Sequence, residues 1–109
     1  MHELSITQSV VDAVLEHVGE ARVLSVRVRV GRLSGVVPDA MRFCFELITE
    51  GTALQDARLE IIEPPGTACC ATCGLEFGLS DLILLCPCGS ADVAVRTGRE
   101  LEIASVEVA

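Results

Sequence analysis

The sequence predicts an α+β fold in which two helices pack on a small three-stranded sheet, with a cysteine-bearing knuckle module inserted before the last strand. Three observations lead to this prediction. Apolar residues recur at helical spacing in two segments, 5–21 and 38–50. Residues 26–30 alternate between valine and arginine, which is the period of a half-buried strand. Five of the six cysteines lie within twenty residues, and an apolar segment follows them.

The first helix is expected over residues 5–21. Ile6, Val10 and Val14 recur on one side. Ser5 is expected to be the N-cap, and Gln8 three residues later completes a capping box. Many of the apolar residues are β-branched, which lowers the intrinsic helix propensity, so this helix needs support from tertiary packing.

The alternating segment 26–30 predicts the first strand, which Gly31 ends. Pro38 opens the second helix, which runs to about Glu50. The apolar face of this helix is formed by Met41, Cys44, Phe45 and Ile48. Residues 58–62 predict the second strand, which Pro64-Pro65-Gly66 terminates.

The cysteine segment follows, and after it residues 92–96 predict a short strand. Residues 101–108 are too apolar for a free tail, so they are expected to return to the first sheet as its third strand. The predicted domains are therefore an α+β domain, 1–65 with 98–109, and an inserted domain, 66–97. This inserted module is expected to be of the zinc-ribbon or rubredoxin-like knuckle type.

Composition excludes several classes of partner. The chain has 109 residues, 8 basic against 16 acidic side chains and a net charge of −8, with 3 Phe and no Trp or Tyr. Nucleic acids and anionic membranes attract clustered cations, and single strands also need aromatic platforms. No stretch approaches the ~20 apolar residues that span a bilayer. Because the N-terminus lacks the basic and apolar regions of a signal peptide, a cytoplasmic location is expected.

The cysteine spacing predicts a metal site. Cys70 and Cys73 form a C-x-x-C-G knuckle, and Cys86 and Cys88 form a second knuckle that is one residue shorter. Four thiolates around one tetrahedral Zn²⁺ close its coordination sphere, so the site is structural rather than catalytic. Disulfides and an iron–sulfur cluster are the alternatives, of which disulfides are disfavoured in a reducing cytosol.

Three other side chains have two interpretations each. Cys69 could replace Cys70 as a ligand, although C-x-x-x-C lacks the usual turn geometry. Cys44 is expected to be a small core hydrophobe. His17 is expected to be exposed rather than a ligand.

The N-terminus offers a second metal site. The Met1 amine, the His2 amide and the His2 imidazole can chelate one ion through adjoining rings, and Glu3 can add an amide or a carboxylate. Nitrogen ligands in a near-planar array suit Ni²⁺ or Cu²⁺. The competing interpretation is a solvent-exposed terminus without function.

The chain resembles the HypA/HybF family of hydrogenase nickel-incorporation proteins. The resemblance is carried by Met1-His2-Glu3-Leu4-Ser5, by Gly31-Arg32-Leu33-Ser34-Gly35-Val36-Val37-Pro38, by Arg42-Phe43-Cys44-Phe45-Glu46 and by the two cysteine knuckles in order. It implies a nickel metallochaperone, not an enzyme, that loads Ni(II) into the large subunit of NiFe-hydrogenase together with a HypB-like maturation GTPase. It leaves a homodimer open and implies no nucleic acid and no membrane partner.

Carried over by residue, the resemblance places nickel at Met1, His2 and Glu3. It places structural zinc at Cys70, Cys73, Cys86 and Cys88. Two departures concern these sites: the second knuckle is one residue short, and the loop before the second helix has Val37 where some members have an acidic residue, with Asp39 two residues on.

Glu46 is expected either to pair with Arg42 on the helix surface or to belong to a partner-facing surface near the nickel end. Two rival functions also stay open. One is a non-catalytic zinc-ribbon adaptor or scaffold, which would not require a free N-terminus. The other is a small metalloenzyme, for which the sequence supplies no acid or base beside an open metal position.

Overall fold

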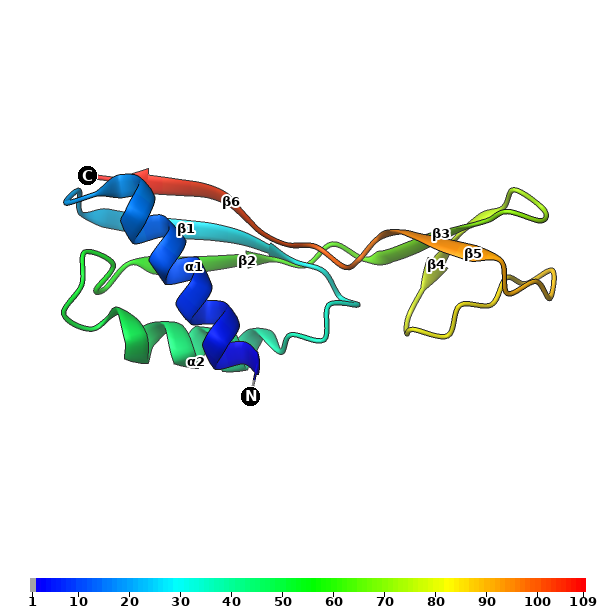
Figure 1. The fold of residues 1–109 in the computed structure, drawn as a ribbon, viewed down its shortest axis with the longest axis horizontal. Coiled ribbons are helices and arrows are strands. Elements are labelled where there is room, and N and C mark those ends of the chain that lie inside the picture. Colours follow the sequence, from blue (N-terminus) through cyan, green and yellow to red (C-terminus); the bar gives the residue numbers. More distant parts are fainter. Residues whose placement is uncertain (1) are drawn as a thin grey trace. The chain divides into compact units, whose positions relative to one another are not determined.

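The computed structural model describes residues 2–109. Along the chain, the elements are α1 (His2–Val18), β1 (Val23–Val30), α2 (Pro38–Thr49), β2 (Arg58–Ile62), β3 (Gly66–Cys70), β4 (Glu76–Leu79), β5 (Val93–Thr97) and β6 (Leu101–Val108) (Figure 1). They fall into two compact units. The first contains the segment ending at Val28 together with Val36–Ile62 and Glu102–Ala109. The second contains Arg29–Gly35 and Glu63–Leu101.

The first helix begins three residues earlier than expected, and the capping box is wrong. α1 already includes His2, and Ser5 lies inside the first turn, where its hydroxyl donates to the carbonyl of His2. Gln8 donates instead to the carboxylate of Asp12. Serine bonds equally well to a carbonyl three residues back, so its presence near a helix start does not locate the cap. The helix ends at Val18, ahead of the predicted residue 21.

β1 is the central strand of the first sheet, whose order is β2-β1-β6. This confirms that the final strand returns to the first sheet. A central strand has hydrogen-bonding partners on both sides, and the alternating burial of Val26, Arg27 and Val28 shows one face against the core. α1 and α2 pack on each other, and both contribute to that core. Its buried helical side chains are Thr7, Val11, Val14, Met41, Phe45 and Thr49.

α2 has the predicted apolar face, with Met41 and Phe45 buried and Ile48 half-buried. Cys44 is a correction: its side chain is half-buried and is not part of the core. The N-cap residue of α2 is Val37, which has no side-chain oxygen to cap the helix, and Pro38 occupies the first turn. The start of α2 therefore depends on other residues for its capping.

The second unit contains a three-stranded antiparallel sheet in the order β4-β3-β5. β5 was predicted within one residue, whereas β3 and β4 were not anticipated. The segment Arg29–Gly35 also belongs to this unit. Its Leu33 is buried, and the Leu33 N–H donates to the carbonyl of Gly98 at 2.7 Å. A Cβ on Gly66 would lie 2.7 Å from Leu33 Cδ1, so only glycine leaves room for this side chain.

Within residues 2–109, no helix has the length and apolar character needed to cross a bilayer.

Candidate metal centres

The sulfur atoms of Cys70, Cys73, Cys86 and Cys88 lie within 4.8 Å of one another. Cys70 Sγ is 3.8 Å from Cys88 Sγ, and Cys73 Sγ is 3.5 Å from Cys86 Sγ. A tetrahedron with metal–sulfur bonds of ~2.3 Å has edges of about 3.8 Å, so these separations fit four thiolates on one ion. They far exceed the length of a disulfide bond, and all four cysteines are free. The four sulfurs are therefore placed so that they could hold one metal ion.

The first knuckle follows directly from β3, which ends at Cys70. The amide of Gly74 donates to the carbonyl of Cys70 at 2.9 Å, and the amide of Cys70 donates to the carbonyl of Leu75. Gly74 has a φ of +76°, a left-handed conformation that glycine adopts without steric cost because it has no Cβ. This turn reverses the chain and brings Cys73 back toward Cys70.

The shortened second knuckle closes in a similar way with one residue fewer. The amide of Gly89 donates to the carbonyl of Cys86 at 2.8 Å, and Gly89 has a φ of +95°. The Cys88 amide donates to Cys86 Sγ at 3.4 Å, so this sulfur still receives a backbone N–H. The hydroxyls of Thr72 and Ser90 lie 2.8 Å apart and join the two knuckles. The missing residue therefore does not prevent the four sulfurs from converging.

Electrostatics at the cluster favours a cation. The pKa of Cys70 falls to about 6, chiefly because the Cys73 amide donates to its sulfur and also because the Thr72 amide does so. The pKa of Cys86 rises to about 12: the Cys88 amide is the largest single influence and lowers it, but burial and the neighbouring thiols together raise it. Adjacent thiols resist joint ionisation because their negative charges repel, and a divalent ion removes that obstacle.

Within the described residues 2–109, the group of converging sulfurs does not include that of Cys69. Consecutive residues of a strand point to opposite faces, and in β3 Ala68 and Cys70 are buried whereas Cys69 is half-buried. Cys69 is paired across the sheet with Glu76 and Ala94. The strand β3, which the sequence analysis did not predict, therefore directs the side chains of Cys69 and Cys70 to opposite faces of the sheet.

Substituting these two neighbours should distinguish them. Cys70→Ser is expected to reduce bound metal from about one equivalent to well below half, because a hydroxyl is a poor replacement for a thiolate ligand. Cys69→Ser is expected to retain the full equivalent. Metal content of the purified, untagged proteins by elemental analysis provides the measurement. Full metal in Cys70→Ser with loss in Cys69→Ser would reverse the assignment.

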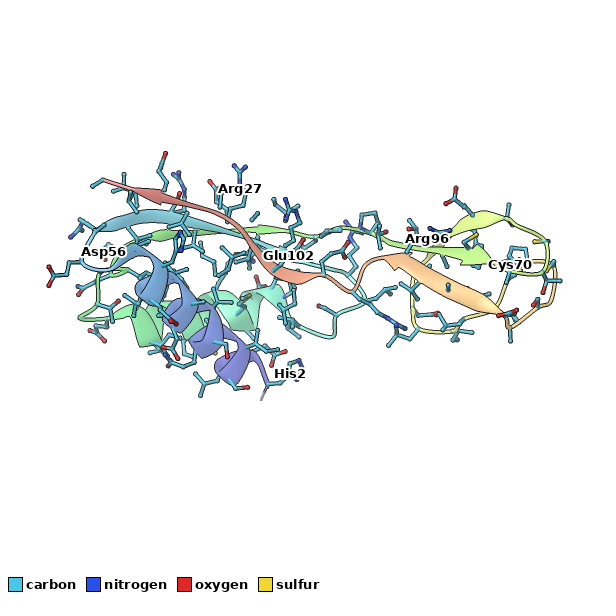
Figure 2. The ribbon with its side chains drawn as sticks, turned by 45° about the horizontal axis from the view of Figure 1, so that its top comes forward. His2, Arg27, Asp56, Cys70, Arg96 and Glu102 are labelled. Carbon is cyan, nitrogen blue, oxygen red and sulfur yellow. The ribbon has the colours of Figure 1, made fainter. Side chains whose placement is uncertain are left out.

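At the N-terminus, the structure brings together His2, Glu3 and the start of α2. Met1 lies outside the described residues. His2 is exposed at the start of α1 (Figure 2), and its Nε2 lies 3.5 Å from Glu3 Oε2. The Val37 amide donates to Glu3 Oε2 at 3.1 Å. This hydrogen bond is the main reason why the pKa of Glu3 is lowered. The carboxylate is therefore fixed beside the imidazole that the sequence assigns to nickel.

The acidic residues of α2 are arranged differently from expectation. Arg42 pairs with Asp39 at 2.9 Å, so the predicted Arg42–Glu46 pair is wrong.

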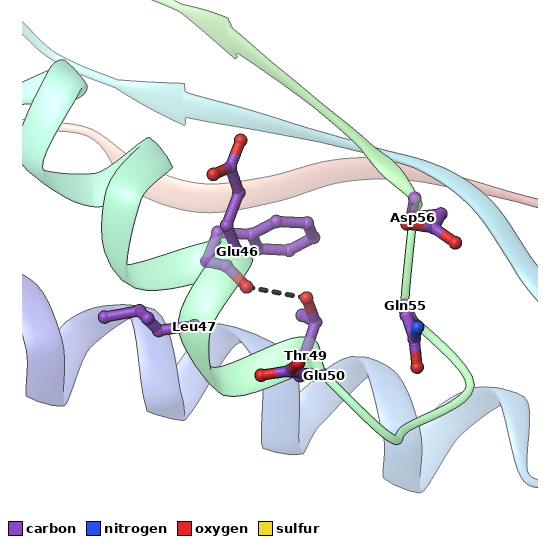
Figure 3. A pocket seen from close by; sticks show the side chains of 8 residues that line it. Glu46, Leu47, Thr49, Glu50, Gln55 and Asp56 are labelled. Atoms are coloured by element: carbon purple, nitrogen blue, oxygen red, sulfur yellow. Dashed lines mark hydrogen bonds between the residues drawn. The ribbon is translucent and has the colours of Figure 1, made fainter.

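Glu46 lines an open pocket of about 510 Å³ that lies along the second half of α2 and the turn before β2 (Figure 3). The other residues lining it are Phe45, Leu47, Thr49, Glu50, Gln55, Asp56 and Ala57. At ~1.5 Å per residue, Glu46 lies about 12 Å along the axis from the first residue of α2, away from the end that meets Glu3.

Sequence reasoning missed two features at the N-terminal end. The first is the backbone amide of Val37, which holds Glu3 although 34 positions separate the two residues. The second is a small, mainly apolar hollow of about 310 Å³, lined by Glu3, Leu4, Ala40, Phe43 and Cys44. Phe43, a large apolar residue of α2 that lies outside the apolar face predicted from the spacing, was a usable signal for the hollow, whereas a backbone donor leaves no trace in a sequence.

Comparison with known proteins gives one consistent result. Residues 1–108 match the family model described as "Hydrogenase/urease nickel incorporation, metallochaperone, hypA". A hydrogenase maturation factor HypA from Geobacter metallireducens is 48% identical over 109 residues, which cover 99% of each chain. One from Nostoc punctiforme is 45% identical over 108 residues, covering 99% of this chain and 96% of the relative.

Comparison of the fold with solved structures also indicates the HypA family. The solution structure of the Ni metallochaperone HypA from Helicobacter pylori matches with a TM-score of 0.69 and 26% identity, covering 97% of this chain and 96% of that one. This confirms the predicted fold class, two helices and a small three-stranded sheet with a cysteine knuckle module. Since the family model spans nearly the whole chain, the protein belongs to the HypA family of nickel-incorporation metallochaperones, which are not enzymes.

Proposed function

We propose that this chain binds Ni(II) at its free N-terminus, through the Met1 amine, His2 and Glu3, and delivers it to the large subunit of NiFe-hydrogenase. The observation that carries the proposal is the exposed His2 imidazole, whose side chain is 55% accessible at the first residue of α1. A chaperone must release its cargo, which favours an exposed site of few ligands over a closed one. The family membership supports nickel as the cargo.

The second metal of the proposal is a structural Zn(II) held by Cys70, Cys73, Cys86 and Cys88. Two of these cysteines, Cys70 and Cys86, are buried, and four thiolates leave no open position for a substrate. Zinc would supply folding free energy to a small unit whose apolar core is limited. The domains then have separate tasks, with nickel in 1–65 and 98–109 and zinc in the inserted 66–97.

The partners in this proposal are a HypB-like maturation GTPase and the hydrogenase large subunit, in a reducing cytoplasm that keeps the four thiols free. A homodimer is compatible with the same role. In this scheme Glu46 is a partner contact at the pocket of α2 and not part of the nickel site.

The test compares two histidines of the same helix. His2→Ala is expected to lose nearly all nickel binding after nickel exposure of the untagged protein, because the only imidazole at the N-terminus is removed, while one zinc is retained. His17→Ala is the matched control, since His17 is also exposed on α1, and it is expected to bind like the native protein. Elemental analysis after gel filtration measures both metals.

In cells, His2→Ala should lower hydrogenase activity and excess nickel should restore it, whereas His17→Ala should have no effect. Nickel binding by His2→Ala at native stoichiometry would refute the site. Normal hydrogenase maturation by that variant would favour the scaffold function instead.

A further inference from the structure

The strand β4 forms an open edge of the sheet in the second unit. The sheet order is β4-β3-β5, so β4 has a neighbour on one side only. The amide of Cys70 donates to the carbonyl of Leu75, and hydrogen-bonded pairs then recur at every second position of this antiparallel ladder. The main-chain groups of Glu76 and Gly78 therefore point away from β3. No other group within residues 2–109 bonds to these outward N–H and C=O groups.

The strand β5 forms the opposite edge, which is less regular. The register between β3 and β5 shifts between Thr67 and Ala68. Irregularities of this kind twist an edge and hinder the addition of a further strand. The register between β3 and β4 runs without a shift from Gly66 to Cys69. The edge at β4 is therefore the one at which a regular ladder can continue.

An open hollow of about 440 Å³ lies at the end of β4. Its lining residues are Arg32, Pro65, Gly66, Gly78, Leu79 and Ser80. Packing does not require a glycine at position 78, because its φ lies outside the left-handed region and an added Cβ would meet nothing closer than the Gly66 carbonyl oxygen, at 3.9 Å. A Cβ on Gly66, in contrast, would lie 2.7 Å from Leu33 Cδ1. The missing side chain of Gly78 keeps the hollow open.

Arg32 supplies a positive charge to this hollow. Its amide donates to the carbonyl of Pro64 at 3.0 Å, and the amide of Ser34 closes the turn on the carbonyl of Gly31 at 2.9 Å. The next residue, Leu33, is buried, so the backbone on both sides of Arg32 is held in place. The Arg32 side chain is exposed and makes no ion pair or hydrogen bond with the part of the chain that the structure describes. A guanidinium in this state can bind a carboxylate through two parallel hydrogen bonds.

Opposite charges therefore lie at the two ends of the β4 edge. Glu76 begins the strand, and Arg32 lies beside Ser80 just after its end. At ~3.3 Å per residue, Glu76 and Ser80 are about 13 Å apart, and side chains four positions apart on a strand share one face. A strand placed antiparallel to β4 complements both charges when an acidic residue precedes a basic one by four positions. One charge of each sign also adds nothing to repulsion by the net charge of −8.

We propose that β4 and the hollow at Arg32 bind an extended segment of a partner protein, which adds a strand to this sheet and places an acidic side chain against Arg32. The outward main-chain groups of Glu76 and Gly78 hold the segment, and Arg32 selects its charge. The surface belongs to the second unit, and its use does not depend on nickel binding at the N-terminus.

Two synthetic peptides test this proposal. The acetylated and amidated peptide Thr-Glu-Val-Thr-Val-Lys-Thr has the charge spacing derived above, and the comparison peptide has glutamine in place of glutamate. Each is titrated to millimolar concentration into the nitrogen-15-labelled, metal-loaded full chain. The amide resonances of Glu76, Gly78 and Ser80 should shift. The glutamate peptide should bind about three- to fivefold more tightly, which is the upper range for an exposed ion pair.

Variants separate the charge from the strand pairing. Arg32→Gln should bind the two peptides equally, within about twofold, because the ion pair is gone. Arg96→Gln is the matched control, since it removes the same charge from β5 and should keep the preference. Gly78→Pro deletes one outward N–H, a change that an open edge tolerates. It should weaken both peptides by about two- to tenfold, the usual range for one lost hydrogen bond.

Equal binding of the two peptides by the native protein, or shifts confined to β5, would overturn the proposal. So would an Arg96→Gln variant that loses the preference as fully as Arg32→Gln, because the effect would then be one of overall charge. Acetate that reproduces the peptide shifts would indicate a carboxylate site without strand pairing. Metal content and circular dichroism establish that each variant is folded. If Gly78→Pro does not fold, Gly78→Val decides, because it has room at its Cβ and fills part of the hollow.

Discussion

A protein extended by a single glycine ahead of Met1 is expected to lose nickel binding, with an affinity at least about a hundredfold below that of the native chain, or ~3 kcal/mol. The extension converts the Met1 amine into an amide nitrogen, which is a much weaker ligand until it loses a proton. It also moves the imidazole of His2 one residue further from the new amine, which breaks the sequence of chelate rings. Calorimetric titration with Ni(II) measures the effect.

The extension should leave the fold and the zinc unchanged. α1 begins at His2, and the first four N–H groups of a helix have no partner within it, so an added residue removes no helical hydrogen bond. The cysteine site belongs to the other compact unit. Native zinc content and circular dichroism are therefore the controls. An extended protein with the native nickel stoichiometry and spectrum would show that the amine is not a ligand.

Replacing Cys73 by alanine, or stripping zinc with a strong chelator, is expected to unfold the unit that contains β3, β4 and β5. Metal binding at such sites contributes folding free energy of order 10 kcal/mol, which exceeds the stability of most small domains. Zinc content should fall from about one equivalent to nearly none. Hydrogen exchange should show rapid exchange of the amides in Gly66–Cys70 and Val93–Thr97.

The α+β unit should survive this change, because its buried side chains on α1, β1 and α2 include none of the four cysteines. Slow exchange in β1 and in both helices is therefore expected in the same sample. Cys44→Ala is the matched control: it removes a half-buried thiol outside the cluster and should retain all the zinc. Protected amides in β3 of fully reduced, metal-free protein would contradict a stabilising role of the metal.

The sequence was most informative where the pattern is local. The alternation of Val26–Val30 identified a strand that proved to be central, and the helical spacing of Met41 and Phe45 identified the buried face of α2. Both patterns follow from the geometry of a single element, in which side chains repeat every 2 or 3.6 residues. The spacing of the cysteines likewise depends on short turns, and the structure brings together the four that the motif indicated.

Predictions from short polar segments were wrong where two local hydrogen-bonding patterns have similar energies. Ser5 and Gln8 match a capping box, yet Ser5 bonds back to His2 within a helix that had already begun. The strand β3 contains only Gly, Thr, Ala and Cys, and β4 has only four residues, of which Phe77 and Leu79 are large and apolar, so neither has a long apolar alternation. Their pairing with each other and with β5 stabilises them more than any intrinsic preference.

By itself, the sequence determined the class of fold, the family, a cluster of cysteines spaced for a metal site and the N-terminal residues proposed for nickel, because each depends on residue types at short, fixed spacings. Only the tertiary structure decided that Cys70 and not Cys69 faces the cluster, that Leu33 is buried beside Gly66 and Gly98, and that Glu3 is held by the Val37 amide. The contacts of Leu33 and Glu3 join segments more than thirty positions apart, and the direction of Cys70 depends on the pairing of β3 with β4 and β5, so no local side-chain pattern encodes them.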